Sequence, residues 1–212
     1  MTGKKELLQK YSKRKAEIEQ RLIHFESVGK KGGETLFEEL AFCILTPQSK
    51  AFSCDLAIQE LKGKNLLFSG NAVQIRAVLA TKTRFHNKKA EYLVGAREKF
   101  KEGGFARLAE ATHSGSEKEA RDILLKEVKG IGWKEASHYL RNVGRGKTIA
   151  ILDRHILKNL ALHGAIEMPK SLTKKKYLEI EKKMEGFCRK LGIPMNHLDL
   201  LFWAEEAGKV FK

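Results

Sequence analysis

The chain has 212 residues, of which 42% are hydrophobic, so it is long enough to bury a core in one large domain or two small ones. Its formal net charge is +15, and basic clusters such as KRK, NKKAEY and SLTKKKY occur along its whole length. A folded surface this positive favours a polyanion, first nucleic acid and then a membrane surface or an acidic protein. The alternative is the solvated Lys- and Glu-rich surface of a heat-adapted protein.

The three cysteines, Cys43, Cys54 and Cys188, lie far apart and form no C-x-x-C pair. Their spacing therefore indicates neither a zinc site nor an iron–sulfur cluster. An odd number of scattered thiols is typical of a reducing compartment, so we expect a cytoplasmic protein. Residues 1–15 lack the apolar core of a signal peptide, and no segment is long and apolar enough to span a membrane.

Helical periodicity runs through nearly the whole chain. There are only three prolines, and β-branched runs with strand-like alternation are absent. We therefore predict an all-α fold. The predicted helices are residues 4–26, 34–45, 47–63, 71–81, 86–101, 105–112, 117–128, 133–143, 153–163, 171–191 and 195–207.

The second predicted helix, ETLFEELAFCIL, is strongly apolar and is expected near the centre of the fold. Pro47 is expected to begin the third helix, because proline suits the first helical position. The stretch GRGK at residues 144–147 is a predicted seam, but no clean linker stands out. We therefore predict two interleaved helical lobes, one formed by residues 1–36 and 148–212 and the other by residues 37–147.

The stretch KGIGWKEASHYLRNVG, residues 129–144, predicts a helix–hairpin–helix. Gly130 and Gly132 let the backbone turn sharply with positive φ, and their lack of side chains lets another backbone approach. Amide groups at the start of the second helix could then bind a phosphate of one DNA strand without reading its sequence. Lys129, at the head of the hairpin, is a further candidate for this contact. The alternative is an ordinary turn with glycine caps.

Lys134 lies in the first turn of the second hairpin helix. The helix dipole is positive at that end and disfavours an ammonium group there, whereas a helix optimised for stability would carry an acid. A partly neutral lysine is a nucleophile for Schiff-base chemistry. The alternative is a lysine that contacts a phosphate.

Asp153 follows the apolar run IAIL and precedes an amphipathic helix, 19 residues after Lys134. Aspartate is a preferred N-cap, so capping alone could explain it. A carboxylate fixed at a helix start beside a neutral lysine could also stabilise a developing cation and accept a proton.

Two motifs together, GIGWK at residues 130–134 and LDRH at residues 152–155, resemble the signature of the helix–hairpin–helix DNA glycosylase superfamily. The stretches RFHNKKAEYL, KEASHYLRNVG and LDLLFWAEEAGKVFK resemble, more narrowly, the type 2 8-oxoguanine DNA glycosylase/AP lyases of archaea and some bacteria. The resemblance covers most of the chain. Like that group, the chain lacks the four-cysteine cluster of the endonuclease III branch. A small departure is Ala207 before Gly208, where the group often has Ser or Thr.

The resemblance implies an active site in the cleft between the two lobes. It implies that Lys134 forms a Schiff base and Asp153 assists it, with strand cleavage by β-elimination. Gln48, in LTPQSKA, stands where the superfamily places the residue that fills the gap left by an extruded nucleotide. DNA would also be held by Lys129 and the hairpin glycines.

For the base pocket, the resemblance indicates Phe85 and Trp203 as the aromatic partners of the base. It also indicates Lys212, because a lysine whose carboxylate ends the chain helps to recognise the base in the type 2 group. His138 lies one turn after the hairpin lysine, and Asp199 lies four residues before Trp203, so both are candidates on the same helix faces.

The expected partner is double-stranded DNA containing 8-oxoguanine, bound by a monomer. Covalent catalysis of this kind needs no metal, although the hairpin carbonyls could hold a monovalent cation. Three alternatives stay open. The chain could act on another oxidised base, it could be a non-catalytic helix–hairpin–helix DNA-binding module, or it could be a basic scaffold with no nucleic-acid role.

Overall fold

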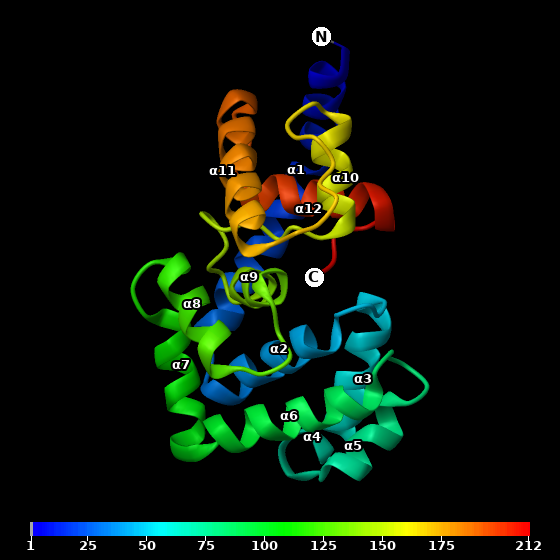
Figure 1. The fold of residues 1–212 in the computed structure, drawn as a ribbon, viewed down its shortest axis with the longest axis vertical. Coiled ribbons are helices and arrows are strands. Elements are labelled where there is room, and N and C mark those ends of the chain that lie inside the picture. The colour runs from blue at the N-terminus through cyan, green and yellow to red at the C-terminus, as the bar shows by residue number, and fades with distance from the viewer. Residues whose placement is uncertain (1) are drawn as a thin grey trace.

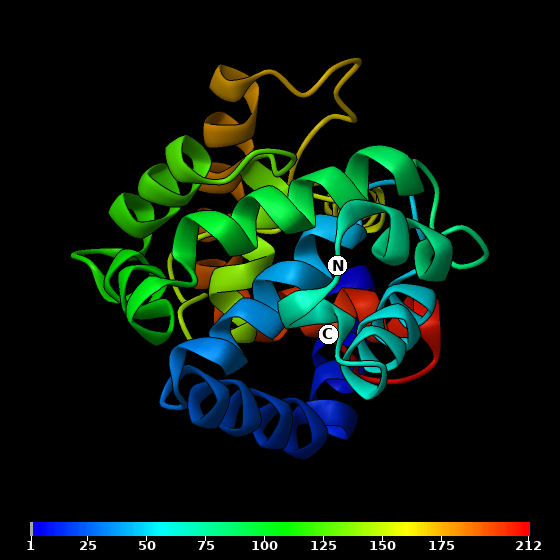
Figure 2. The same ribbon diagram turned by 90° about the horizontal axis from the view of Figure 1, so that it is seen from below.

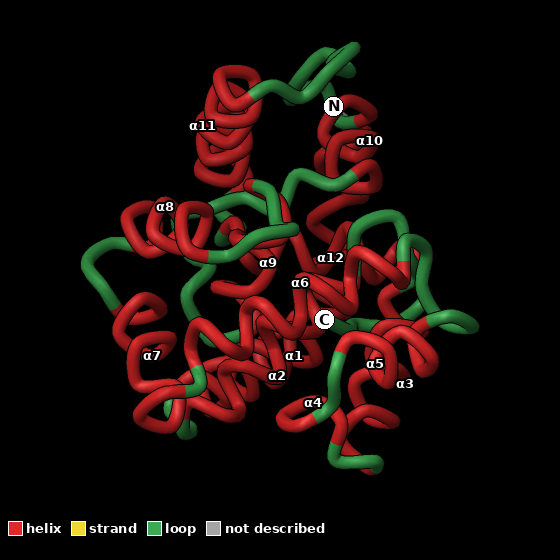
Figure 3. The backbone as a smooth tube through the Cα atoms, turned by 60° about the horizontal axis from the view of Figure 1, so that its bottom comes forward, coloured by secondary structure: helices red, strands yellow, loops and turns green. Residues whose placement is uncertain are grey.

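The computed structural model describes residues 2–212, and within them all regular structure is helical and no strand occurs, which confirms the predicted all-α fold (Figures 1 and 3). The elements are α1 (Thr2–Gly29), α2 (Gly33–Leu45), α3 (Ala51–Gly63), α4 (Leu66–Ser69), α5 (Ala72–Leu79), α6 (His86–Phe100), the 3₁₀ turn η1 (Glu102–Phe105), α7 (Ala106–His113), α8 (Glu117–Glu127), α9 (Trp133–Asn142), α10 (Arg154–Leu162), α11 (Lys174–Leu191) and α12 (Met195–Ala207).

Buried apolar side chains form two clusters. One joins α2 to α9 and includes Val28 and Ile149, and the other packs most of α1 against α10, α11 and α12. In Figure 1 the second group lies above the first, with α9 and the C-terminus at the level where they meet. The chain passes from the second cluster to the first within α1, between Phe25 and Val28. It returns to the second cluster between Ile149 and Ala150. The lobe boundaries stay a prediction, but α1 contributes side chains to both clusters.

α2 forms the centre of the first cluster, as its apolar sequence predicts. Leu36, Phe37 and every residue from Leu40 to Leu45 have no exposed surface. Each buried Leu, Ile or Phe side chain contributes about 1.5–3 kcal/mol relative to an exposed one. Seen from below, α2 runs through the middle of its group while α1 lies along one edge (Figure 2). Because α2 is tightly packed, it supports the turn at residues 46–50 that follows it.

The third helix begins at Ala51, so the prediction that Pro47 begins it is wrong. In a helix from Pro47, the carbonyl of that residue would accept from the Ala51 amide. Instead Lys89 Nζ donates to Leu45 O at 2.7 Å, to Pro47 O at 2.8 Å and to Ser49 Oγ at 2.8 Å. The buried ammonium thus holds residues 46–50 as a tight turn.

Other boundaries follow local capping. Thr173 Oγ1 accepts from Lys176 N at 3.3 Å and starts α11 three residues after the predicted position at residue 171. The short helix α4 was not predicted. Within residues 2–212, every helix is either too short or too polar to serve as a membrane span.

Candidate active site

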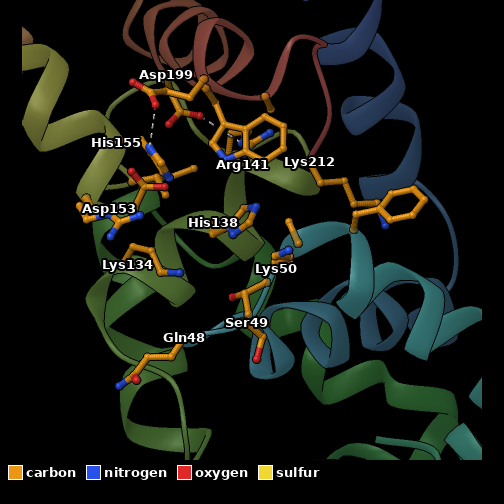
Figure 4. A pocket seen from close by; sticks show the side chains of 18 of the residues that line it. Gln48, Ser49, Lys50, Lys134, His138, Arg141, Asp153, His155, Asp199 and Lys212 are labelled. Carbon is orange, nitrogen blue, oxygen red and sulfur yellow. Dashed lines mark ion pairs between the residues drawn. The ribbon is translucent and has the colours of Figure 1, made fainter. Parts of the chain in front are cut away.

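A pocket of about 900 Å³ opens between the two helical groups (Figure 4). Its walls come from the turn before α3, one face of α9, the segment that leads into α10, α12 and the last residue of the chain. Its lining includes three carboxylates, Asp153, Asp199 and Glu206, and twice as many cations. The cations are Lys50, Arg84, Lys134, Arg141, Arg154 and Lys212. This excess of positive charge suits a polyanionic ligand.

The two hairpin glycines have different roles. Gly130 has φ of 89°, and a Cβ added there would lie 2.2 Å from the Tyr92 ring. Gly132 is the N-cap of α9 with φ of −111°, so the expectation of positive φ at both glycines is wrong. Gly130 alone makes the sharp turn. The backbone is already extended at Gly132.

Glu135 occupies the start of α9. Its Oε2 accepts from Gly132 N at 3.1 Å, and its Oε1 lies 3.0 Å from Lys134 Nζ. The Gly132 amide that was expected to grip DNA is therefore bonded to a carboxylate within the protein. A phosphate that binds this amide must displace Glu135.

Asp153 is the N-cap of α10 and also faces the pocket. Its Oδ1 accepts from Ile156 N at 2.8 Å, which fixes the carboxylate at the helix start. Figure 4 shows Asp153 and Lys134 directed into the same space from two different segments. Capping and a catalytic role are therefore compatible, since one carboxylate oxygen caps the helix and the other is not needed for it.

The inner face of α9 carries His138 and Arg141 into the pocket, where Asp199 of α12 meets them. Burial lowers the pKa of His138 well below its usual value, and the nearby charges of Arg141 and Lys134 lower it further, so the imidazole is neutral. Arg141 Nε and Asp199 Oδ2 are 3.5 Å apart, an ion pair without a hydrogen bond. Burial raises the pKa of Asp199 to about 6 despite this partner.

Several atoms of this group have no hydrogen-bond partner within residues 2–212, namely His138 Nε2, Arg141 Nη1 and Asp199 Oδ2. Buried polar groups are normally satisfied, and exceptions call for an explanation. Arg141 Nη1 is a donor, Asp199 Oδ2 is an acceptor, and His138 Nε2 is one or the other according to its tautomer, so these residues of the pocket lining can bind a polar ligand.

The end of the chain closes the pocket. Lys212 Nζ pairs with Glu39 Oε1 at 2.8 Å and with Asp55 Oδ1 at 3.2 Å, and lies 4.7 Å from the centre of the Phe42 ring. These contacts anchor the C-terminus to α2 and α3. Trp203 lines the pocket close to this end.

The structure brings Lys134, Asp153, His138, Asp199, Trp203, Lys212 and Gln48 to this one pocket. It does not bring Phe85 there. That ring is 54% exposed at the left-handed N-cap of α6 and lines a separate hollow beside Pro47 and Gly130. Phe85 has a left-handed backbone with φ of 57°, and its neighbour Arg84 lines the pocket. Lys129 and the two hairpin glycines lie on the exposed surface.

Arg141 is the residue that sequence reasoning missed. It lies three residues after His138 and seven after Lys134, on the same face of α9, so the helical spacing that indicated His138 could have found it. In the part of the chain that the structure describes, no group of three or more His, Cys, Asp or Glu side chains is arranged to hold a metal ion.

A helical hairpin with a lysine at the start of its second helix, facing an N-cap aspartate across a basic pocket, defines a helix–hairpin–helix DNA glycosylase. A model of the family described as 8-oxoguanine DNA glycosylase matches residues 18–193, and the chain belongs to that family.

Relatives match over nearly the full length. The 8-oxoguanine DNA glycosylase/AP lyase of Fusobacterium nucleatum is 44% identical over 205 residues, which are 95% of this chain and 94% of the relative. The crystal structure of the 8-oxoguanine DNA glycosylase of Thermotoga maritima has a TM-score of 0.87 at 34% identity and covers 99% of this chain and 98% of its own. The crystal structure of the Methanocaldococcus jannaschii 8-oxoguanine glycosylase/lyase in complex with a 15mer DNA containing 8-oxoguanine has a TM-score of 0.84 at 35% identity. The match covers 97% of this chain and 99% of that chain.

Proposed function

We propose that this protein excises 8-oxoguanine from double-stranded DNA and then cleaves the strand at the resulting abasic site. The observation that carries the proposal is the convergence of Lys134 and Asp153 on one basic pocket. Its support is the match to relatives named 8-oxoguanine DNA glycosylase/AP lyase.

The base must leave the stack before any side chain can reach its bond to the sugar. Gln48 lies in the turn before α3 with φ of 52° and lines the pocket, where it can fill the space that the nucleotide leaves. The extruded purine would lie against Trp203. Its polar edge would meet His138, Arg141 and Asp199.

Base release begins when the Lys134 ammonium leaves its partner Glu135 and gives a proton to solvent, and the neutral amine then attacks C1′ of the sugar. The bond from C1′ to the base breaks, and the Asp153 carboxylate stabilises the positive charge that develops at the sugar. The base takes up a proton as it leaves. The lysine nitrogen then loses a proton, the ring oxygen gains one as the sugar ring opens, and a protonated imine joins Lys134 to C1′.

Strand cleavage follows from the imine, which acidifies the proton on C2′. Loss of that proton and β-elimination break the bond to the 3′ phosphate. No step needs a metal, and we propose that none is resident. The hairpin carbonyls are the place where a monovalent cation would bind.

The surroundings support a DNA-binding monomer. The Lys and Arg side chains of the pocket can contact phosphates, so binding should weaken steeply with salt. One chain supplies every wall of the pocket, so we propose that a single copy acts on each lesion. Cys43, Cys54 and Cys188 are free thiols, which suits our proposal of a cytoplasmic protein.

Borohydride trapping tests the mechanism. The protein is mixed with a duplex that carries one 8-oxoguanine, borohydride is added, and a covalent protein–DNA band is sought beside the Lys134→Gln variant. A band in the wild type that the variant loses is the expected result. Base release without a band would reject the imine and indicate a monofunctional glycosylase. Tight DNA binding with neither result would reject this lesion and favour another oxidised base or a binding module.

A further inference from the structure

A buried ion pair joins the two helical groups behind the pocket. Arg121 of α8 donates to Glu181 of α11 through both terminal guanidinium nitrogens, with Nη1 to Oε2 at 2.6 Å and Nη2 to Oε1 at 2.9 Å. Their side chains are only 1% and 5% exposed, and neither lines the pocket. In Figure 1 the lower end of α11 reaches the level of α8 and α9.

One side of the pair holds the helix that carries Lys134. Arg121 Nη1 donates to Ser137 Oγ at 3.1 Å, and the guanidinium lies 4.5 Å from the centre of the Trp133 ring. Trp133 directly precedes Lys134, and Ser137 follows it by three residues. The start of α9 is therefore fixed to Arg121 at two points around the catalytic lysine.

The other side holds the segment that ends at Asp153. Ala150 N donates to Glu181 Oε2 at 2.8 Å, and Tyr177 OH donates to Ala150 O at 2.6 Å. Leu152 N donates to the same Tyr177 hydroxyl at 3.3 Å. Leu152 directly precedes Asp153, so this network fixes the backbone up to the catalytic carboxylate.

The network serves geometry more than stability. A buried ion pair loses much of its attraction to desolvation, and apolar replacements of similar size are often as stable. What the pair provides is a defined separation between the parts it joins. Residues 149–152 have no helix of their own, so their polar backbone groups depend on partners such as Glu181 and Tyr177.

We infer that Arg121, Glu181 and Tyr177 are positioning residues that set the separation between Lys134 and Asp153. The inference rests on the proposed function. Since reacting groups must meet within a fraction of an ångström, a shift of about 1 Å at either residue can lower the rate by about 100-fold.

The Tyr177→Phe variant tests the inference, because it removes only the hydroxyl oxygen. The matched control is Tyr139→Phe. Tyr139 is also fully buried, and its hydroxyl bonds to Thr112 Oγ1 at 2.6 Å, on the side of α9 toward α7. The measurements are the single-turnover rate of base release, the Kd for a duplex with an abasic-site analogue, and Tm. We expect Tyr177→Phe to lower the rate by about 10-fold with Kd unchanged, and Tyr139→Phe to keep the wild-type rate at a similar loss of Tm.

A second variant separates position from folding. Arg121→Met combined with Glu181→Leu replaces the pair by apolar side chains, which should keep the fold while it releases Ala150 N and Ser137. We expect the rate of base release to fall by about 100-fold at unchanged Kd. A wild-type rate in both the double variant and Tyr177→Phe would overturn the inference. A wild-type protein that releases no 8-oxoguanine would instead overturn the proposed function.

Discussion

Lys134 Nζ and Glu135 Oε1 form an ion pair at 3.0 Å, so the amine that we propose as the nucleophile is bound to its sequence neighbour in the free protein. The same carboxylate accepts from Gly132 N, the amide that the sequence predicts as a phosphate contact. Under the proposed mechanism, Glu135 would therefore compete with a DNA phosphate for the Gly132 amide and hold Lys134 away from the sugar.

We predict that Glu135→Gln accelerates imine formation. Glutamine can still accept from Gly132 N, but it releases Lys134. Partly exposed pairs are worth about 0.2–1 kcal/mol, so the trapping rate should rise by up to about 5-fold. Glu127→Gln is the control, because Glu127 pairs with Lys99 and Arg107 outside the pocket. A slower Glu135→Gln enzyme would show that Glu135 assists catalysis.

Lys89 supports the turn that carries Gln48, and Lys89→Met should impair extrusion of the base. Its side chain is buried, which lowers the pKa of the amine to about 8, and it donates to three oxygens of this turn and its flanks. We expect excision from duplex DNA to fall by about 10-fold and excision from single-stranded DNA to stay near wild type, since the latter needs no filled gap. Lys88→Met is the control, because Lys88 is 67% exposed. Equal losses on both substrates would contradict this role.

The raised pKa of Asp199 predicts that the free energy of unfolding depends on pH. Burial raises the pKa of its carboxyl from 3.8 to about 6, so between these values the folded protein binds a proton that the unfolded chain lacks. The free energy of unfolding should therefore fall as the pH rises through this window, by about 3 kcal/mol in total.

The measurement is urea unfolding of the wild type and Asp199→Asn at pH 4 to 7. In Asp199→Asn, the part of the fall in unfolding free energy with rising pH that comes from Asp199 should be absent. Asp122→Asn, a change at an exposed aspartate, should keep it. Parallel curves for the wild type and Asp199→Asn would show that Asp199 titrates normally.

Lys212 should matter for base release and not for cleavage of an abasic site. Its ion pairs with Glu39 and Asp55 hold Lys212 at the pocket where we propose that the base binds, and an abasic substrate has no base to recognise. Lys212→Ala should slow excision of 8-oxoguanine by about 10-fold, while abasic-site cleavage and Kd change little. The ratio of the two rates in one preparation is the readout. If both rates fell together, Lys212 would be needed for the fold as a whole and not for recognition of the base.

The hairpin glycines should differ in their tolerance of alanine. Gly130→Ala places a Cβ 2.2 Å from Tyr92 at a positive φ, so it should destabilise the fold by about 1–3 kcal/mol. Gly132→Ala has an ordinary φ and a nearest contact of 3.3 Å to Glu135 Oε2, so its cost should be well below that of Gly130→Ala. Chemical denaturation of the two variants measures the difference. Equal costs would mean that Gly132 is also conformationally required.

The sequence by itself determined the all-α fold and the hairpin, and it indicated Lys134 and Asp153. These features are local. Apolar spacing predicts helices, and two short motifs place a lysine and an aspartate at helix starts, whatever the packing of the rest. His138 could also be found, because it shares a helix face with Lys134.

Only the tertiary structure decided which distant residues meet. Lys89 turns the chain at Pro47 from 42 residues away, Arg121 meets Glu181 across 60 residues, and Arg141 faces Asp199 on another helix. Phe85 lies outside the pocket for the same reason. Helical periodicity shows which face of a helix is buried, but the partner of a buried polar group depends on how the helices pack, and no local pattern encodes that.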